Sequence, residues 1–135
     1  MNVPEDREYT QSHEWIRIDG ESAVVGITAR HPAAGKEILG VRLPEMFFAV
    51  KTGDVVAKIL LADDEQGICA PISGSVVEVN LELDSTPRLV LDDPYATGWL
   101  FRLKIEAGEE IEHLLSASAY FDYVRLEENL DVESP

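Results

Sequence analysis

The chain contains few of the residues that most enzymes and metal sites need. It has one cysteine, Cys69, so no disulfide can form within the chain, which fits a reducing cytosol. Its three histidines, His13, His31 and His113, do not lie at metal-ligand spacing from one another or from Cys69. There is no glycine-rich phosphate loop, and no Ser–His–Asp set can be assigned. We therefore expect no resident metal and no enzymatic activity.

Basic residues and long apolar runs are also scarce. Eleven Lys and Arg face 26 Asp and Glu, which gives a net charge of −15. This charge repels phosphate backbones and anionic lipid, so we expect neither nucleic-acid nor membrane binding. A basic protein partner would suit this surface, although acidity by itself also simply keeps a protein soluble. No apolar run approaches the roughly 20 residues that span a bilayer, and the first ten residues contain no apolar segment typical of a signal peptide. We expect a cytoplasmic protein.

What the sequence does contain is alternating strands. In "HEWIRID", residues 13–19, Trp15 and Arg17 alternate with Ile16 and Ile18. Asp19-Gly20 then marks a turn, and "SAVVGIT" follows as a second strand. "EILGVRLP", "VVAKILLA" (55–62), "ICAPISG", "SVVEVNLEL" and "WLFRLKI" predict further strands. The fold class is therefore mostly β, with residues 84–98 expected as a loop.

Helices are expected in two places. Residues 29–36 suggest one short helix, although Pro32 and Gly35 weaken it. After residue 108, Ile111, Leu114 and Leu115 have helical spacing, and a second short helix is expected to begin after Ser116 or Ser118. We expect an N-terminal extension at 1–8, one domain at 9–126 that includes these helices, and an acidic tail at 127–135.

Several ordered motifs resemble one known family. "YTQSHEWIRIDGESAVVGIT" (9–28), "LPE" (43–45), "APISGSVVEVN" (70–80), "PRLVLDDPY" (87–95) and "GWLFRLKI" (98–105) are similar to motifs of the glycine cleavage system H protein, in the same order. The resemblance extends without gaps from about Tyr9 to Ile105, and the segment "IEHLLSASAYFDYV" resembles the family's C-terminal helices.

This resemblance implies both a fold and a role. The fold is a barrel-sandwich hybrid of the lipoyl-domain type, in which two small sheets pack together and a hairpin projects at one end. An H protein is not an enzyme itself. It carries a lipoyl group on a lysine at the hairpin tip and moves an aminomethyl group between the other glycine cleavage proteins, so that the tether makes each encounter effectively intramolecular.

The position of that lysine is occupied here by an acid. Counting back from Pro71, the family's lipoyl-lysine aligns with Asp63, and the Glu-Ser-Val before it aligns with residues 60–62, Leu-Leu-Ala. A carboxylate cannot form an amide with lipoate. We therefore expect no lipoyl cofactor on this chain.

The cleft in which the family's loaded arm folds back is partly changed as well. The resemblance assigns it Ser12 and Glu14, which are present, together with a histidine that aligns with Ala34 and an aspartate that aligns with Gly67.

Other residues leave alternatives open. Lys58 is a substitute attachment site in the second hypothesis, although it lies inside the strand expected at 55–62, and residues 59–67 contain no lysine. A third hypothesis places a cation or small amine on the acidic turn Asp63, Asp64 and Glu65, together with Glu14. The acids of the turn are consecutive, whereas calcium loops use alternate positions, which favours a solvated turn.

Phe47 and Phe48 stand in a turn where the family usually has glycine and small residues. We expect them to pack beneath the loop; if exposed, they would form a contact patch with the partner, as would residues 63–65. The leading hypothesis is a non-enzymatic accessory or interaction protein. It would use the H-protein surface to bind a protein of glycine cleavage or lipoate metabolism.

Overall fold

The structure is a computed structural model that describes residues 3–106, 111 and 113–133, the last five of these as backbone only. The strands and helices of the described residues follow one another in this order: β1 Glu8–Tyr9, β2 Glu14–Asp19, β3 Ser22–Ile27, β4 Ile38–Arg42, β5 Ala49–Val50, β6 Val55–Leu61, β7 Glu65–Cys69, β8 Gly74–Val79, α1 Glu82–Ser85, α2 Leu89–Asp92, β9 Phe101–Ile105 and α3 Ala117–Glu133.

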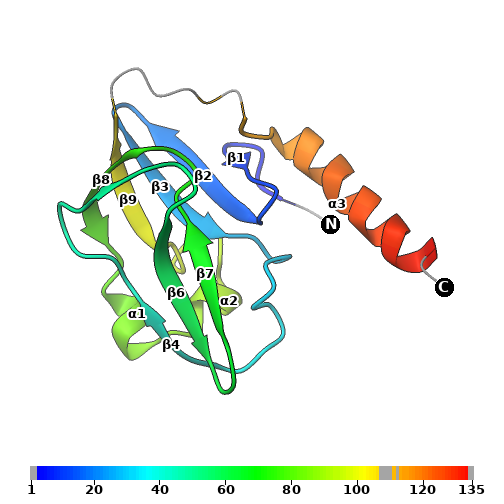
Figure 1. The fold of residues 1–135 in the computed structure, drawn as a ribbon, viewed down its shortest axis with the longest axis horizontal. Helices are drawn as coiled ribbons and strands as arrows, with labels where there is room; N and C mark the ends of the chain where they lie inside the picture. Colours follow the sequence, from blue (N-terminus) through cyan, green and yellow to red (C-terminus); the bar gives the residue numbers. More distant parts are fainter. Residues whose placement is uncertain (1–2, 107–110, 112, 134–135) are drawn as a thin grey trace.

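The strands form two antiparallel sheets. The larger has the order β1-β2-β3-β9-β8-β5, and the smaller has the order β4-β6-β7. In Figure 1 the β6–β7 hairpin runs down the small sheet and projects at the lower end of the molecule. The mostly β sandwich expected from the sequence is confirmed, with a projecting hairpin where the resemblance placed one.

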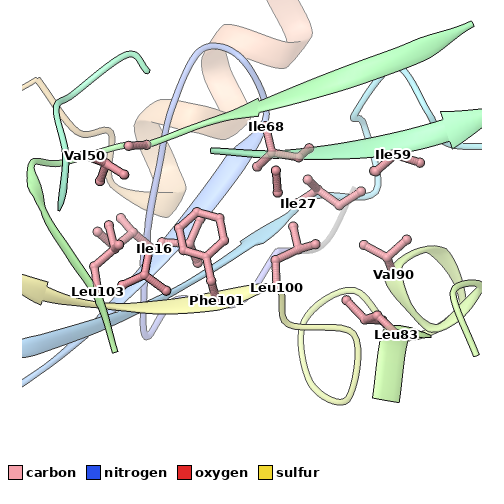
Figure 2. Packing of buried hydrophobic residues seen from close by; sticks show 14 of the residues in the cluster. Ile16, Ile27, Val50, Ile59, Ile68, Leu83, Val90, Leu100, Phe101 and Leu103 are labelled. Atoms are coloured by element: carbon pink, nitrogen blue, oxygen red, sulfur yellow. The ribbon is translucent and has the colours of Figure 1, made fainter. Parts of the chain in front are cut away.

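The core lies between the two sheets. Figure 2 shows Ile59 and Ile68 on the side of the small sheet and Phe101 and Leu103 on the side of the large one, and all four side chains are fully buried. Full burial of such a side chain contributes roughly 1.5–3 kcal/mol. Alternation explains the pattern, because the buried residues of β6 are Ala57, Ile59 and Leu61 while those between them are only half-buried.

The prediction of a short helix at residues 29–36 is wrong. The segment is a chain of turns, in which the backbone N–H groups of His31, Ala34 and Lys36 donate to carbonyls three residues earlier. Pro32 cannot donate such a bond, and Gly35 has a φ of +80°, outside the helical range.

In the described part of the chain after β9, the structure has one helix where the sequence predicted two. The helix expected at 111–115 falls partly outside the described residues. In its described part, Leu115 pairs with Tyr9 through two backbone hydrogen bonds, so this segment extends the edge of β1. The second expected helix is present as α3 and continues to Glu133, across the boundary expected at 127. The loop expected at 84–98 also contains α2 and the end of α1, two helices of four residues each.

Buried polar contacts attach α3 to the sheet. The Tyr120 hydroxyl lies 2.7 Å from the Thr28 hydroxyl and 2.7 Å from Nδ1 of His13, and its ring stacks on Tyr9 at 4.8 Å. Burial raises the pKa of Tyr120, so its hydroxyl stays protonated and can donate one of these bonds. No described helix is both long and apolar enough to cross a membrane.

The packing of Trp15 of β2 against Gly26 of β3 can be tested by substitution. The Trp15 indole lies over Gly26, where an added Cβ would come within 2.5 Å of ring carbons, and its Nε1–H donates to the Pro94 carbonyl. We expect Gly26→Ala to lower the free energy of unfolding by about 3 kcal/mol, because the ring must leave its site. Urea denaturation measures this.

Gly40→Ala is the matched control for that substitution. Gly40 is also a strand glycine, but a Cβ there would meet its nearest neighbour, Leu60, at an ordinary 3.7 Å. Equal denaturation midpoints for the two variants would contradict the assigned role of the Trp15 contact.

Candidate functional site at the hairpin and its flanks

A tight turn places Asp63 at the apex of the β6–β7 hairpin. The Leu61 N–H donates to the Asp64 carbonyl at 2.8 Å, and Leu60 pairs with Glu65 in the next position of the ladder. Only Ala62 and Asp63 lie between the closing pair, and both are exposed. The carboxylates of Asp63 and Asp64 therefore project into solvent, where they can make ionic contacts with a partner.

The two lysines near the hairpin lie away from this apex. Lys58 sits within β6 opposite Gly67, and its Nζ is 2.8 Å from Oε1 of Glu65. The hydrogen bond from Lys58 lowers the pKa of the exposed Glu65 carboxyl, which favours its ionised form. Lys51 precedes β6 and lies 3.5 Å from Glu106.

Ser12 and Glu14 are brought together beside β7. The Glu14 carboxylate is 1% exposed, and one oxygen accepts hydrogen bonds from the hydroxyls of Ser12 at 2.6 Å and Thr10 at 2.7 Å. The other oxygen accepts the backbone N–H of Cys69 at 3.2 Å. Burial raises the Glu14 pKa, and these donors partly offset the increase. Both oxygens are thus occupied by the chain itself.

That carboxylate makes a structural joint that the sequence did not reveal. It links the turn before β2 in the large sheet to β7 in the small one, and Cys69 is the residue at the contact. The Cys69 thiol is half-buried, as expected, and burial followed by the charge of Glu14 raises its pKa, so it is a weak nucleophile. In the sequence, the only indication of this contact was that Ser12 and Glu14 stand close together in one short motif.

The two altered positions of the expected cleft offer no polar side chain. Ala34 is exposed in the turns of 29–36, and Gly67 is exposed on β7. A Cβ at Gly67 would lie 3.2 Å from Cγ1 of Val55, so an aspartate there would require that valine to shift. Among the described residues, no group of three or more His, Cys, Asp or Glu side chains is arranged to hold a metal ion.

Phe47 and Phe48 do not pack beneath their loop, and that expectation is wrong. Their side chains are 77% and 58% exposed. The cause is the backbone: the Phe47 N–H donates to the Val76 carbonyl, and the Val76 N–H donates to the Phe48 carbonyl. These bonds to β8 hold Phe47 at a φ of +66°, in the left-handed region that favours glycine.

Comparisons with known proteins agree with this geometry. A profile of the glycine cleavage H-protein family matches residues 7–127. The chain belongs to the glycine cleavage H-protein family. The glycine cleavage system H protein of Thermus thermophilus is 40% identical over 127 residues, which cover 94% of this chain and 99% of that protein.

Two further relatives extend the comparison. A probable glycine cleavage system H protein 1 of Sulfolobus acidocaldarius is 40% identical over 95% of this chain and 93% of its own length. The crystal structure of a glycine cleavage system H protein from Mycobacterium marinum superposes with a TM-score of 0.77 at 32% identity, covering 93% of this chain and 99% of that one. The family expectation and the fold expectation are both confirmed.

The buried His31 predicts a pH dependence of stability. Its Nδ1 accepts the Ala33 N–H at 3.2 Å, and burial, with a smaller effect of the His13 charge, lowers its pKa to about 4. As the pH falls from 7 to 5, the unfolded chain protonates this histidine while the folded chain does not. The free energy of unfolding should therefore fall by about 2 kcal/mol from this group.

His31→Asn isolates that contribution, because asparagine can accept the same N–H two residues on but does not titrate. Urea denaturation at pH 7 and pH 5 should show a smaller loss of stability for the variant than for the wild type. The same loss in both proteins would assign the pH dependence to other groups.

Because the backbone of Phe47 lies in the left-handed region, we expect a glycine at this position to stabilise the protein. Phe47→Gly should raise the free energy of unfolding by about 1 kcal/mol, because glycine adopts this φ without the clash of a Cβ. Phe48→Gly is the control: Phe48 has no positive φ, so glycine there should be neutral or destabilising. Urea denaturation measures both variants. A loss of stability in Phe47→Gly would contradict the claim that the positive φ of Phe47 costs the folded chain free energy.

Proposed function

We propose that this H-protein family member is a non-enzymatic interaction protein that bears no lipoyl group and binds a protein partner through the surface it shares with the family. The observation that supports this most directly is the hairpin apex, which presents Asp63 where a lipoyl carrier needs a lysine.

The chemistry at the apex supports the absence of a lipoyl group. Lipoate is attached through an amide, and the amide requires an amine nucleophile that a ligase can reach. Asp63 offers a carboxylate, and no shift of register supplies a lysine, because residues 59–67 contain none. The residues before Asp63, Leu60 to Ala62, also differ from the Glu-Ser-Val that the resemblance places there.

Lys58 is a poor substitute for the missing lysine. It lies five residues before Asp63, within the β6 ladder, and its Nζ is paired with Glu65 at 2.8 Å. To react, the amine would have to leave this ion pair and lose its proton, and it would still stand on the face of the sheet rather than at its tip. The alternative of a carrier that uses Lys58 therefore receives no support from the geometry.

The residues that align with the family's arm cleft do not offer free polar groups. Glu14 already accepts three hydrogen bonds from its own chain, so it lacks a free oxygen for a cofactor arm. The positions of Ala34 and Gly67 supply no side-chain donors or acceptors. By contrast, the motifs that build the two sheets are kept, including Trp15 packed on Gly26.

A surface kept without its cofactor favours a role in binding. The partner class that best fits the family scaffold is a protein of glycine cleavage or of lipoate metabolism, in the cytoplasm. The exposed acids Asp63, Asp64 and Glu65 at the hairpin would contribute an ionic contact.

A lipoylation assay tests this proposal. The full chain is incubated with a lipoyl ligase, ATP and lipoate, and its intact mass is measured; a lipoyl-accepting H protein serves as the positive control. We expect the wild-type mass to stay unchanged. A gain of one lipoyl group would overturn the proposal, and peptide mapping to Lys58, with loss of the gain in Lys58→Arg, would establish the carrier alternative.

A further inference from the structure

An apolar groove opens beside the exposed aromatic residues. It has a volume of about 290 Å³ and lies between the end of β4, the loop that follows it and the first half of β6. Its lining, here named the β4–β6 groove, consists of Arg42, Leu43, Pro44, Glu45, Phe48, Val55, Val56, Ala57 and Lys58.

Exposed apolar side chains line the groove and precede it in the chain. Phe48 and Val55 line it and are 58% and 57% exposed, and Phe47 and Met46, just before Phe48 in the chain, are 77% and 44% exposed. Phenylalanine, methionine and arginine are enriched at protein interfaces, and exposed apolar side chains that gather on a surface mark such sites.

Two features that cost the isolated chain stability border this groove. Phe47 is held in the left-handed backbone region. Arg42 of β4 and Lys58 of β6 are directly opposed in the ladder, so two positive charges project on the same face of the small sheet. Like charges in this position repel one another.

Only part of that repulsion is relieved within the chain. Glu65 pairs with Lys58, and Arg42 forms no ion pair with any described residue, although its charge also acts on Glu65. Glu45 is the single carboxylate in the groove lining. The lining thus holds two cationic side chains and one carboxylate, and because Glu65 pairs with Lys58, Arg42 is the lining cation without an ion pair among the described residues, on a chain whose net charge is −15.

We propose that the β4–β6 groove binds a segment of a partner protein that places an apolar side chain in the groove and an adjacent carboxylate on Arg42. The inference rests on the proposed interaction role and assigns its surface. A guanidinium pairs with a carboxylate through two parallel hydrogen bonds, so Arg42 is the residue that orients the segment. Phe48 in the lining and the exposed Phe47 next to it in the chain offer apolar contacts to a peptide segment.

The net charge of the chain opposes the binding of an acidic segment. At long range a net charge of −15 repels an acidic segment, so binding has to come from the groove itself. A basic segment, by contrast, would be attracted over the whole surface. Preference for an acidic segment therefore separates the proposed site from non-specific attraction.

The test uses the full chain, labelled with nitrogen-15, and three synthetic 12-residue peptides. They share the same leucine and phenylalanine positions and differ in their polar residues, which are glutamate, serine or lysine. We expect the glutamate peptide to give saturable amide shifts at residues 42–48 and 55–58. We expect at least tenfold weaker binding of the serine peptide.

Variants connect those shifts to the groove. Arg42→Glu and Phe48→Ser should each weaken binding of the glutamate peptide at least tenfold, and Arg42→Glu should lower its preference over the lysine peptide. Leu81→Ser is the control, because Leu81 is also an exposed apolar side chain, 68% against 58% for Phe48, but lies outside the groove lining. Urea denaturation confirms that each variant is folded.

Several results would overturn the proposal. They are absence of glutamate-peptide binding at millimolar concentration, equal or tighter binding of the lysine peptide, or shifts centred elsewhere. Sodium octanoate is titrated separately, and binding of octanoate without any peptide would assign the groove to a small carboxylate instead. Each of these leaves the lipoylation result intact, and lipoylation of the chain would leave the peptide result intact, so the two proposals fail separately.

Discussion

The register of the small sheet is the constraint on which the rest of the structure depends. The bond between the Leu61 N–H and the Asp64 carbonyl closes the hairpin, and from it follow the apex position of Asp63 and the place of Lys58 within the ladder. A slip by one residue would move Ile59 and Ile68 out of the core, so burial enforces this register. The same register sets Arg42 opposite Lys58.

The joint made by Glu14 then orients this hairpin on the rest of the domain. A buried carboxylate is expensive unless hydrogen bonds satisfy it, and here three donors do so from two segments of the chain. The Glu14 carboxylate is therefore part of the contact between the sheets.

Strands were the most predictable part of the fold. Alternation in residues 55–61 reports which side faces the core, whereas residues 23–27 are all buried, and the turn at Asp19-Gly20 is present, with Gly20 at a φ of +64°. Short helices were less predictable. Four-residue helices such as α2 lack a full period of apolar residues, and the turns at 29–36 satisfy their backbone without forming a helix.

The sequence could predict only those parts of the site that depend on neighbouring residues in the chain. The apex position of Asp63 follows from counting within a hairpin, and the structure places it there. The exposure of Phe47 and Phe48 could not be predicted, because hydrogen bonds to Val76, distant in sequence, decide it. The opposition of Arg42 and Lys58 likewise depends on pairing between separate strands.

The most direct measurement of the central claim is the intact mass of this chain isolated from its own cells, in which the native lipoylating enzymes have had access to it. The account predicts a single species with the mass of the unmodified polypeptide. A species heavier by one lipoyl group, mapped to any residue of the chain, would contradict it.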